Sequence, residues 1–291
     1  MSASLHVFPD TSAFGAALAR AARRRVVPVD LHRFPDGESL VRVRAPVGRH
    51  AILVRALADP NERLVEVLLA ADALRRAGAR RVTLVAPYLP YMRQDAVFHP
   101  GEPVSQRVVG RLLGEAFDGV LTIEAHLHRV RRLAEVVPGR SRSVSAAPAL
   151  AAWLRSRGGA WFVVGPDEES APWVRAIARG AGARAVVARK VRHGDRAVSV
   201  EVPAAAGGAR AVVVDDIASS GATIAATARA LRAAGARSVD AIVSHAIFAP
   251  GAEARIRAAG VRRLLSCDTL PHCTNAIGVA ALVAAALPRS T

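Results

Sequence analysis

The sequence predicts an α/β protein of two similar domains, each a mainly parallel sheet flanked by helices. Short apolar runs alternate with amphipathic stretches along the chain, and most of the runs are continuous, as in strands buried on both faces of a parallel sheet. A ten-residue pattern also occurs twice, as ALRRAGARRV at 73–82 and ALRAAGARSV at 230–239. Because the two copies lie about half a chain apart, they indicate a duplicated unit.

Residue type, and the glycines and prolines that end helices and strands, predict the individual elements. Strands are expected where apolar and β-branched residues run together, at 50–55, 81–86, 120–123, 161–165, 185–188, 211–214, 241–244 and 263–266. Helices are expected over 61–77, 104–116, 147–156, 171–181, 223–234 and 252–259, several of them followed by the glycine that commonly ends a helix. A Pro-Gly-containing segment, 138–141, favours a boundary that gives domains at 1–145 and 146–291.

The charge balance is strongly basic, with 40 Lys and Arg against 24 Asp and Glu. Nucleic-acid binding is one interpretation of such a balance. The basic residues are scattered, however, and only 4% of residues are aromatic and able to stack on bases. We therefore expect small anionic substrates rather than nucleic acid.

One basic residue differs from all the others, because Lys190 is the single lysine of the chain. A lysine ammonium is a compact point charge, whereas an arginine guanidinium is a planar fork. Lys190 therefore either fills a role that arginine cannot fill or is a surface lysine that survived by chance.

The two cysteines, Cys267 and Cys273, are too few for a disulfide framework and fit a reducing compartment. His272 adjoins Cys273, but no second ligand pair accompanies them, so a zinc site is not expected. The longest apolar run, 276–287, is too short to cross a bilayer. We expect a cytoplasmic protein without a membrane partner.

The clearest local signal for a site is the segment 211–224, AVVVDDIASSGATI. An apolar strand leads into Asp215 and Asp216, and small residues follow before a helix. Small side chains allow backbone N–H groups to converge on an anion, and the helix N-terminus favours negative charge. The two carboxylates suit sugar hydroxyls or a hydrated Mg²⁺. A capped helix after a core strand is the alternative, although adjacent acids at such a strand end are costly without a ligand.

This loop resembles the phosphoribosyl-pyrophosphate motif of the type I phosphoribosyltransferase fold, which serves both phosphoribosyltransferases and ribose-phosphate pyrophosphokinases. Two further segments resemble the pyrophosphokinases in particular. RFPDGE at 33–38 is similar to the family's adenine-contacting segment, and YMRQD at 91–95 contains its Arg-Gln-Asp triplet. The resemblance implies that both domains have this fold, and that a neighbouring subunit of a homo-oligomer completes the ATP site.

Three shorter matches extend the resemblance. His126 in IEAHLH stands at the family's histidine that contacts ATP or Mg²⁺, with Glu124 where aspartate is usual. Asp167 matches the family's Pro-Asp, and Lys190 with Arg192 resembles its catalytic Lys-x-Arg. The chain departs from the family at Glu168-Glu169-Ser170, where glycines are common, and at Ser219, where aspartate is common.

The resemblance implies a ribose-phosphate pyrophosphokinase that moves the pyrophosphate of ATP onto ribose 5-phosphate with Mg²⁺ as cofactor. Lys190 and Arg192 are the expected catalytic residues, and His126 and Asp167 the expected metal-binding residues. Expected to bind ATP are Phe34, Asp36, Glu38, Arg93, Gln94, Asp95 and His126. Expected to bind ribose 5-phosphate are Asp215, Asp216, Ser219, Ser220, Gly221, Ala222 and Thr223. A phosphoribosyltransferase and a non-catalytic regulatory homologue are the alternatives.

Overall fold

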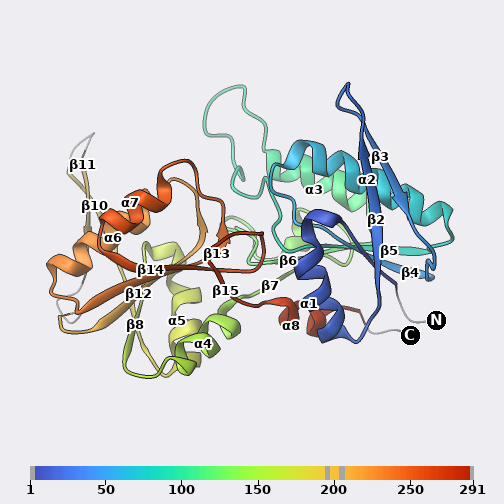
Figure 1. The fold of residues 1–291 in the computed structure, drawn as a ribbon. Coiled ribbons are helices and arrows are strands. Elements are labelled where there is room, and N and C mark those ends of the chain that lie inside the picture. The colour runs from blue at the N-terminus through green and yellow to red at the C-terminus, as the bar shows by residue number, and fades with distance from the viewer. Residues whose placement is uncertain (1–3, 194–196, 203–206, 289–291) are drawn as a thin grey trace. The chain divides into compact units, whose positions relative to one another are not determined.

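The computed structural model describes residues 4–193, 197–202 and 207–288, with residues 190–193 and 197–199 described by their backbone alone. It divides into two compact units (Figure 1). The first comprises the chain up to Val144, Thr269–Pro271 and the segment from Val279 onward. The second comprises Ser145–Asp268 and His272–Gly278. The end of the chain thus belongs to the first unit, whereas the sequence-based division at 145/146 assigns it to the second.

The first unit is built on a seven-stranded sheet with the order β3-β2-β1-β4-β5-β6-β7. All neighbours are parallel except β2 and β3, which form an antiparallel hairpin. The strands are β1 (Ser4–Val7), β2 (Val26–Arg33), β3 (Ser39–Val43), β4 (His50–Val54), β5 (Arg81–Ala86), β6 (Gly119–Ile123) and β7 (Arg142–Val144).

Helices pack on this sheet by their apolar faces. The helices of the first unit are α1 (Ser12–Ala22), α2 (Pro60–Arg76), α3 (Ser105–Ala116) and α8 (Ala280–Ala286), with 3₁₀ turns η1 (Pro9–Thr11) and η2 (Leu133–Glu135). Buried side chains of α2 and α3, such as Leu74 and Leu113, share one core with strand residues such as Leu53 and Leu84. Helix α8 packs beside α1 and contacts β6 and β7.

The second unit is built on a six-stranded parallel sheet with the order β15-β14-β13-β12-β8-β9, beside an antiparallel β10–β11 pair. Its strands are β8 (Trp161–Gly165), β9 (Arg184–Val187), β10 (Arg189–His193), β11 (Ala197–Glu201), β12 (Arg210–Ala218), β13 (Ser238–Ala246), β14 (Val261–Cys267) and β15 (Asn275–Ile277). Its helices are α4 (Ala147–Ser156), α5 (Ala171–Ala181), α6 (Ala222–Ala233) and α7 (Ala252–Ala258), with a 3₁₀ turn η3 (Glu168–Ser170). The prediction of two mainly parallel sheets flanked by helices is confirmed.

The repeated ten-residue pattern has the same local structure in both units. Each copy ends a helix, turns at a glycine with positive φ (Gly78, 102°; Gly235, 81°) and enters a strand. The next residue closes the turn in each case. The Ala79 N–H donates to the Leu74 carbonyl and the Ala236 N–H donates to the Leu231 carbonyl, both at 3.0 Å. The pattern therefore marks equivalent helix–turn–strand junctions.

A buried ion pair anchors α2 near the β2–β3 hairpin. The side chains of Arg55 and Glu66 are 3% and 1% exposed and form a direct ion pair. Arg55 also lies 3.1 Å from an Asp10 carboxylate oxygen, and its guanidinium stacks over the Phe8 ring. The Ser39 hydroxyl at the start of β3 donates to Glu66 at 2.6 Å. Glu66 thus ties the hairpin to the end of β4.

No helix within the described ranges is long and apolar enough to cross a membrane.

Candidate active site

The predicted ribose 5-phosphate segment begins on strand β12 and continues into the turn that follows it. β12 continues to Ala218 because it keeps its pairing with β13, so the strand extends beyond the predicted end at Val214. Asp215 and Asp216 therefore lie on the strand itself. The Asp216 N–H donates to the Asp215 carboxylate at 3.0 Å, and the Ile217 N–H donates to the Asp216 carboxylate at 2.7 Å.

The small residues that follow form a tight turn into α6. Ser220 is exposed, and its hydroxyl accepts from the Ala222 N–H at 3.4 Å. Gly221, with φ of 70°, is the N-cap of α6, whose first residues include Ala222 and Thr223. The first N–H groups of a helix have no partners within the helix, so this turn offers donors to an anion.

Residues of helix α7 pack against this turn and hydrogen-bond to it. A Cβ on Gly221 would lie 2.8 Å from Ile256 Cδ1 and 3.1 Å from the Ala252 carbonyl oxygen. The Arg255 guanidinium donates to the Ser220 carbonyl at 2.7 Å, and the Ala249 N–H donates to the Ser219 carbonyl at 3.1 Å. Glycine is therefore required at position 221 for two reasons, the backbone angle and the space.

Carboxylates gather at this edge of the sheet. Burial raises the pKa of Asp215 well above the ordinary aspartate value, and the negative charges of Asp216 and Asp167 raise it further. Asp167 follows β8, the strand next to β12, and its side chain accepts from the Ser170 N–H at 3.2 Å. Since ligands bind at the carboxyl ends of strands in open α/β sheets, these three acids lie where a site is expected.

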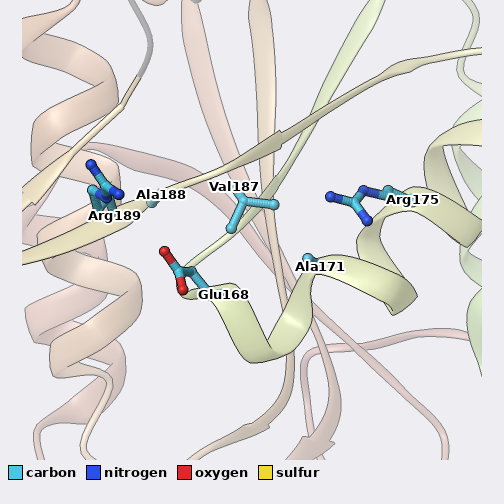
Figure 2. Close-up of a pocket in the computed structure, with 6 residues that line it drawn as sticks. All are labelled: Glu168, Ala171, Arg175, Val187, Ala188 and Arg189. Carbon is cyan, nitrogen blue, oxygen red and sulfur yellow. The ribbon is translucent and has the colours of Figure 1, made fainter.

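A pocket of about 510 Å³ opens beside Asp167 (Figure 2). It is lined by Glu168, Ala171, Arg175, Val187, Ala188 and Arg189. Two guanidiniums and one carboxylate therefore face a volume of the size that small ligands occupy. Sequence reasoning missed Arg175 and Arg189, although the position of Arg189 next to Lys190 was a usable signal. It did single out Glu168 as a departure, and the structure assigns that side chain to the pocket wall.

Lys190 and Arg192 lie on β10, directly after this pocket. Their backbones pair with β11 opposite Val200 and Val198. Their side chains lie outside the described part of the chain.

In the first unit, the segment 33–38 forms the exposed turn of the β2–β3 hairpin. The Phe34 N–H donates to the Glu38 carbonyl at 2.8 Å, and Asp36 accepts from the Glu38 N–H at 3.1 Å. The Phe34 ring is 39% exposed and meets the edge of the His32 ring at 4.8 Å. Phe34, Asp36 and Glu38 are thus brought together at one tip, where Phe34 is partly exposed to solvent.

The other predicted residues of the first unit follow the neighbouring strands β5 and β6. Arg93 is exposed, and Gln94 accepts a hydrogen bond from the Ser105 hydroxyl at 2.7 Å. Asp95 forms an ion pair at 3.3 Å with Arg129, which lies in the loop after β6. That loop also contains His126, and the structure therefore brings these predicted residues onto adjacent loops.

His126 and His128 form a close pair. Their Nε2 atoms are 2.5 Å apart, and their ring centroids are 3.8 Å apart. Glu124, just before them, has φ of 37°, and Tyr91 in the preceding loop has φ of 63°. Such backbone angles are strained for residues other than glycine and often occur at functional sites.

Comparison with known proteins covers nearly the whole chain. Residues 6–116 match the model of the N-terminal domain of ribose phosphate pyrophosphokinase, and residues 141–281 match that of the phosphoribosyl transferase domain. The ribose-phosphate pyrophosphokinase of Methanopyrus kandleri is 34% identical over 277 residues, which are 94% of this chain and 94% of that protein. That of Thermococcus kodakarensis is 33% identical over 261 residues, or 89% and 92% of the two chains.

A solved structure shares the fold. Phosphoribosylpyrophosphate synthetase from Mycobacterium smegmatis aligns with a TM-score of 0.84 at 24% identity, covering 98% of this chain and 97% of that one. The sequence matches extend over both units and include relatives more than 30% identical across most of their length. The chain therefore belongs to the ribose-phosphate pyrophosphokinase family.

Proposed function

We infer that this chain catalyses the conversion of ATP and ribose 5-phosphate to AMP and 5-phosphoribosyl 1-pyrophosphate. The family membership carries this assignment. In the reaction, the 1-hydroxyl of ribose 5-phosphate attacks the β-phosphorus of ATP in line and AMP leaves. Such transfers depend on positioning and on charge stabilisation rather than on covalent help from the protein.

The turn after β12 is the proposed ribose 5-phosphate site. The hydroxyls of Ser219, Ser220 and Thr223, together with N–H groups from Gly221 and Ala222 onward, would hold the 5-phosphate. Asp215 and Asp216 would accept hydrogen bonds from the ribose hydroxyls. The rigid support from α7 favours this proposal, because a pre-organised turn loses little entropy when the phosphate binds.

The proposed ATP site uses the residues of the first unit. Phe34 offers a partly exposed aromatic ring for adenine, with Asp36 and Glu38 as hydrogen-bond acceptors for its amino group. Arg93 would contact phosphate. Gln94 and Asp95 would hold the loop after β5 in place through their contacts with Ser105 and Arg129. The Gln94–Ser105 and Asp95–Arg129 interactions support that division of roles.

Charge on the transferred group would be neutralised by Lys190 and Arg192. Both follow closely after Arg189, which lines the pocket together with Arg175. Four cationic residues therefore belong to the pocket or to the strand that follows it. Removing one preorganised donor of this kind typically lowers the rate ~10²–10³-fold.

Mg²⁺ is the proposed cofactor, and the donor set fits it. Carboxylate oxygens are the ligands that Mg²⁺ prefers, and Asp167, Asp215 and Asp216 are close enough that their charges shift one pKa. We propose Asp167 as a metal-binding residue, and His126 as a residue that contacts Mg²⁺ or the ATP phosphates. When bound, Mg²⁺ neutralises phosphate charge and fixes the triphosphate geometry.

A homo-oligomer is proposed as the working form. Large apolar side chains are exposed on the outer faces of two helices that pack on each other, Val65 and Leu69 on α2 and Val108 and Leu112 on α3. An exposed apolar group of this kind marks an interaction surface. We also propose a cytoplasmic location, since Cys267 and Cys273 form no disulfide and fit a reducing compartment.

The test is ³¹P NMR of the purified protein with ATP, Mg²⁺ and ribose 5-phosphate, run beside Lys190→Ala and Lys190→Arg. We expect AMP and phosphoribosyl pyrophosphate signals to appear together. We expect both variants to lose ~10²–10³ in rate, because arginine keeps the charge without the compact ammonium.

A wild-type protein that binds ribose 5-phosphate but forms neither product would contradict the assignment and favour a regulatory homologue. Release of pyrophosphate from phosphoribosyl pyrophosphate on addition of a nucleobase would instead indicate a phosphoribosyltransferase. A fully active Lys190→Arg would remove the special role of the lone lysine.

A further inference from the structure

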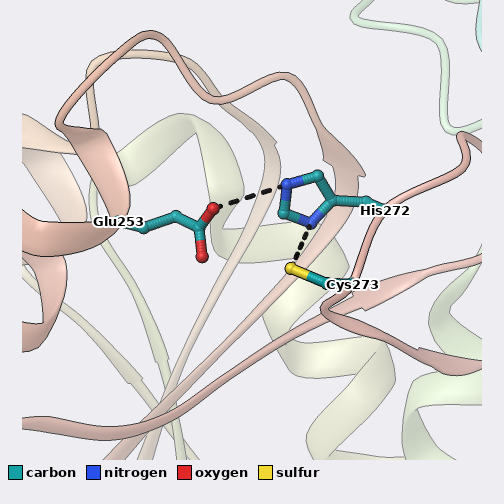
Figure 3. A group of neighbouring side chains, drawn as sticks. All are labelled: Glu253, His272 and Cys273. Atoms are coloured by element: carbon teal, nitrogen blue, oxygen red, sulfur yellow. Dashed lines mark hydrogen bonds and ion pairs between the residues drawn. The ribbon is translucent and has the colours of Figure 1, made fainter.

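Three side chains with different donor atoms converge in the second unit, outside the residues assigned to the reaction. Glu253 lies in the first turn of α7, and His272 and Cys273 lie in the segment between β14 and β15 (Figure 3). One carboxylate oxygen, one imidazole nitrogen and the thiol sulfur all lie within 4.8 Å of one another. The sequence offered only the His-Cys dipeptide, since Glu253 is distant along the chain and is supplied by the fold.

The separation of the carboxylate oxygen and the imidazole nitrogen is close to that around a small four-coordinate metal. Ligands at about 2.0–2.1 Å in a tetrahedron place a nitrogen and an oxygen about 3.3 Å apart. His272 Nε2 and Glu253 Oε1 are 3.5 Å apart. The Cys273 sulfur lies on the other side of the ring, 3.9 Å from His272 Nδ1. Cys273 is exposed, and its side chain must turn about the Cα–Cβ bond to reach the metal–sulfur distance of about 2.3 Å.

Contacts at Nδ1 and at the ring hold the His272 imidazole in place. His272 Nδ1 is 2.8 Å from the Thr274 hydroxyl oxygen, and the ring packs against Phe248 at a centroid distance of 5.2 Å. Thr274 is itself buried and hydrogen-bonded to Ser266 at 2.7 Å. The Thr274 N–H also donates to His272 Nδ1 at 3.2 Å. A metal bound at Nε2 requires that Nδ1 carry the proton and donate it to the Thr274 hydroxyl instead, the arrangement typical of metal-bound histidines.

We propose that Glu253, His272 and Cys273 form a site for a divalent transition metal of the zinc class, with water as the fourth ligand. A thiolate and an imidazole select borderline-soft ions over Mg²⁺, which takes oxygen ligands, so this site is distinct from that of the proposed cofactor. Binding deprotonates the thiol, and the affinity therefore rises with pH. The proposal does not depend on the function proposed above.

The experiment is an optical titration of the untagged, reduced protein with Co²⁺, followed by displacement with Zn²⁺. We expect one equivalent of Co²⁺ to produce a thiolate-to-cobalt charge-transfer band, which Zn²⁺ removes. Cys273→Ser should abolish the band. Cys267→Ser is the matched control and should retain it, because Cys267 is buried on β14 outside the group. Glu253→Gln should weaken binding at least 10-fold, because even the loss of a residue that only hydrogen-bonds to a metal ligand typically costs ~10–100-fold.

The His126–His128 pair can also bind Co²⁺, but it contains no sulfur and gives no charge-transfer band. Visible absorption without that band would therefore overturn the proposal, as would a band that survives Cys273→Ser. Thermal melts provide an independent readout that also reports on folding. Zn²⁺ should raise the melting temperature of wild type and of Cys267→Ser by more than that of Cys273→Ser, and an equal rise in all three would contradict the proposal.

Discussion

Two glycines in the second unit have similar backbone angles and different surroundings. Gly221 and Gly251 cap α6 and α7 with φ of 70° and 79°. A Cβ on Gly221 meets Ile256 and Ala252, whereas a Cβ on Gly251 has no atom within 4 Å. The pair therefore separates backbone strain from crowding at the phosphate turn.

Gly251→Ala should destabilise the protein by about 1 kcal/mol, the cost of a left-handed backbone for alanine. Gly221→Ala should cost about 3 kcal/mol, because overpacking is added to the same strain. Denaturation midpoints measure the difference, and calorimetric titration measures affinity for ribose 5-phosphate. Equal midpoints, or unchanged affinity in Gly221→Ala, would show that α7 does not shape the turn.

Two aspartates on adjacent strands are held in opposite ways. Asp240 on β13 is fully buried and paired with Arg262 and Arg263, at 3.4 and 2.6 Å. Asp215 on β12 has other acids as neighbours, and its pKa is raised by burial first and by their charges second. The charge of Asp240 is therefore balanced by two arginines, whereas the carboxylate of Asp215 lies at the site with other carboxylates as its neighbours.

Asp215→Asn should raise the melting temperature at neutral pH while lowering activity about 10²-fold. A raised folded-state pKa means that the contribution of Asp215 to stability is full below the ordinary aspartate pKa and is lost as pH rises through the folded value. The gain from Asn should accordingly vanish in acid. Asp240→Asn, the control, should lower stability by about 2 kcal/mol, because it weakens charge-assisted hydrogen bonds. A destabilised Asp215→Asn would contradict this account.

At the scale of elements, the anchoring of the β2–β3 hairpin depends on Glu66. Glu66→Gln keeps the shape of the side chain but leaves buried Arg55 with Asp10 as its remaining ion-pair partner among the described residues. We expect a loss of about 3 kcal/mol, typical of breaking a buried pair. We also expect a higher KM for ATP with an unchanged KM for ribose 5-phosphate, since the hairpin tip carries Phe34.

Asp72→Asn is the matched control for that change. Asp72 pairs with Arg76 at 2.6 Å on the same helix, but both side chains are exposed, 63% and 80%. Exposed pairs of this kind contribute little to stability, because water and salt screen them. Urea titration distinguishes the two substitutions, and similar losses would mean that the buried network has no special role.

The elements that the sequence predicted best are those with one dominant signal. Apolar runs predicted β5 and β8 to the residue, and amphipathic stretches with a clear start predicted α4 and α5 equally well. The β2–β3 hairpin was missed because it is largely exposed, and α8 was missed because alanine-rich sequence has little amphipathic contrast.

The candidate site shows the same division. Motifs at strand ends were predictable, since neighbouring parallel strands carry their loops to one edge. Contacts that depend on distant segments were not, such as the support of Gly221 by α7 or the approach of Glu253 to His272. The roles proposed for Lys190 and Arg192 stay predictions.

At the scale of the whole molecule, the exposed apolar residues of α2 and α3 should control assembly. Val108, which is 61% exposed, is a suitable probe. Val108→Glu should shift light-scattering mass toward the monomer and lower activity if a neighbouring subunit completes the site. Ala176→Glu adds the same charge at an exposed position on α5 and should change neither. A monomeric wild type would exclude the oligomer.

The position of α8 has a consequence for how the protein is made. This helix packs on α1, and the Arg24 guanidinium reaches the Pro288 carbonyl at 3.4 Å. The first unit therefore needs residues that are synthesised only after the sheet of the second unit. The N-terminal half is synthesised first and should emerge with the side of α1 that α8 covers still open to water. It should remain a chaperone substrate until α8 itself has left the exit tunnel.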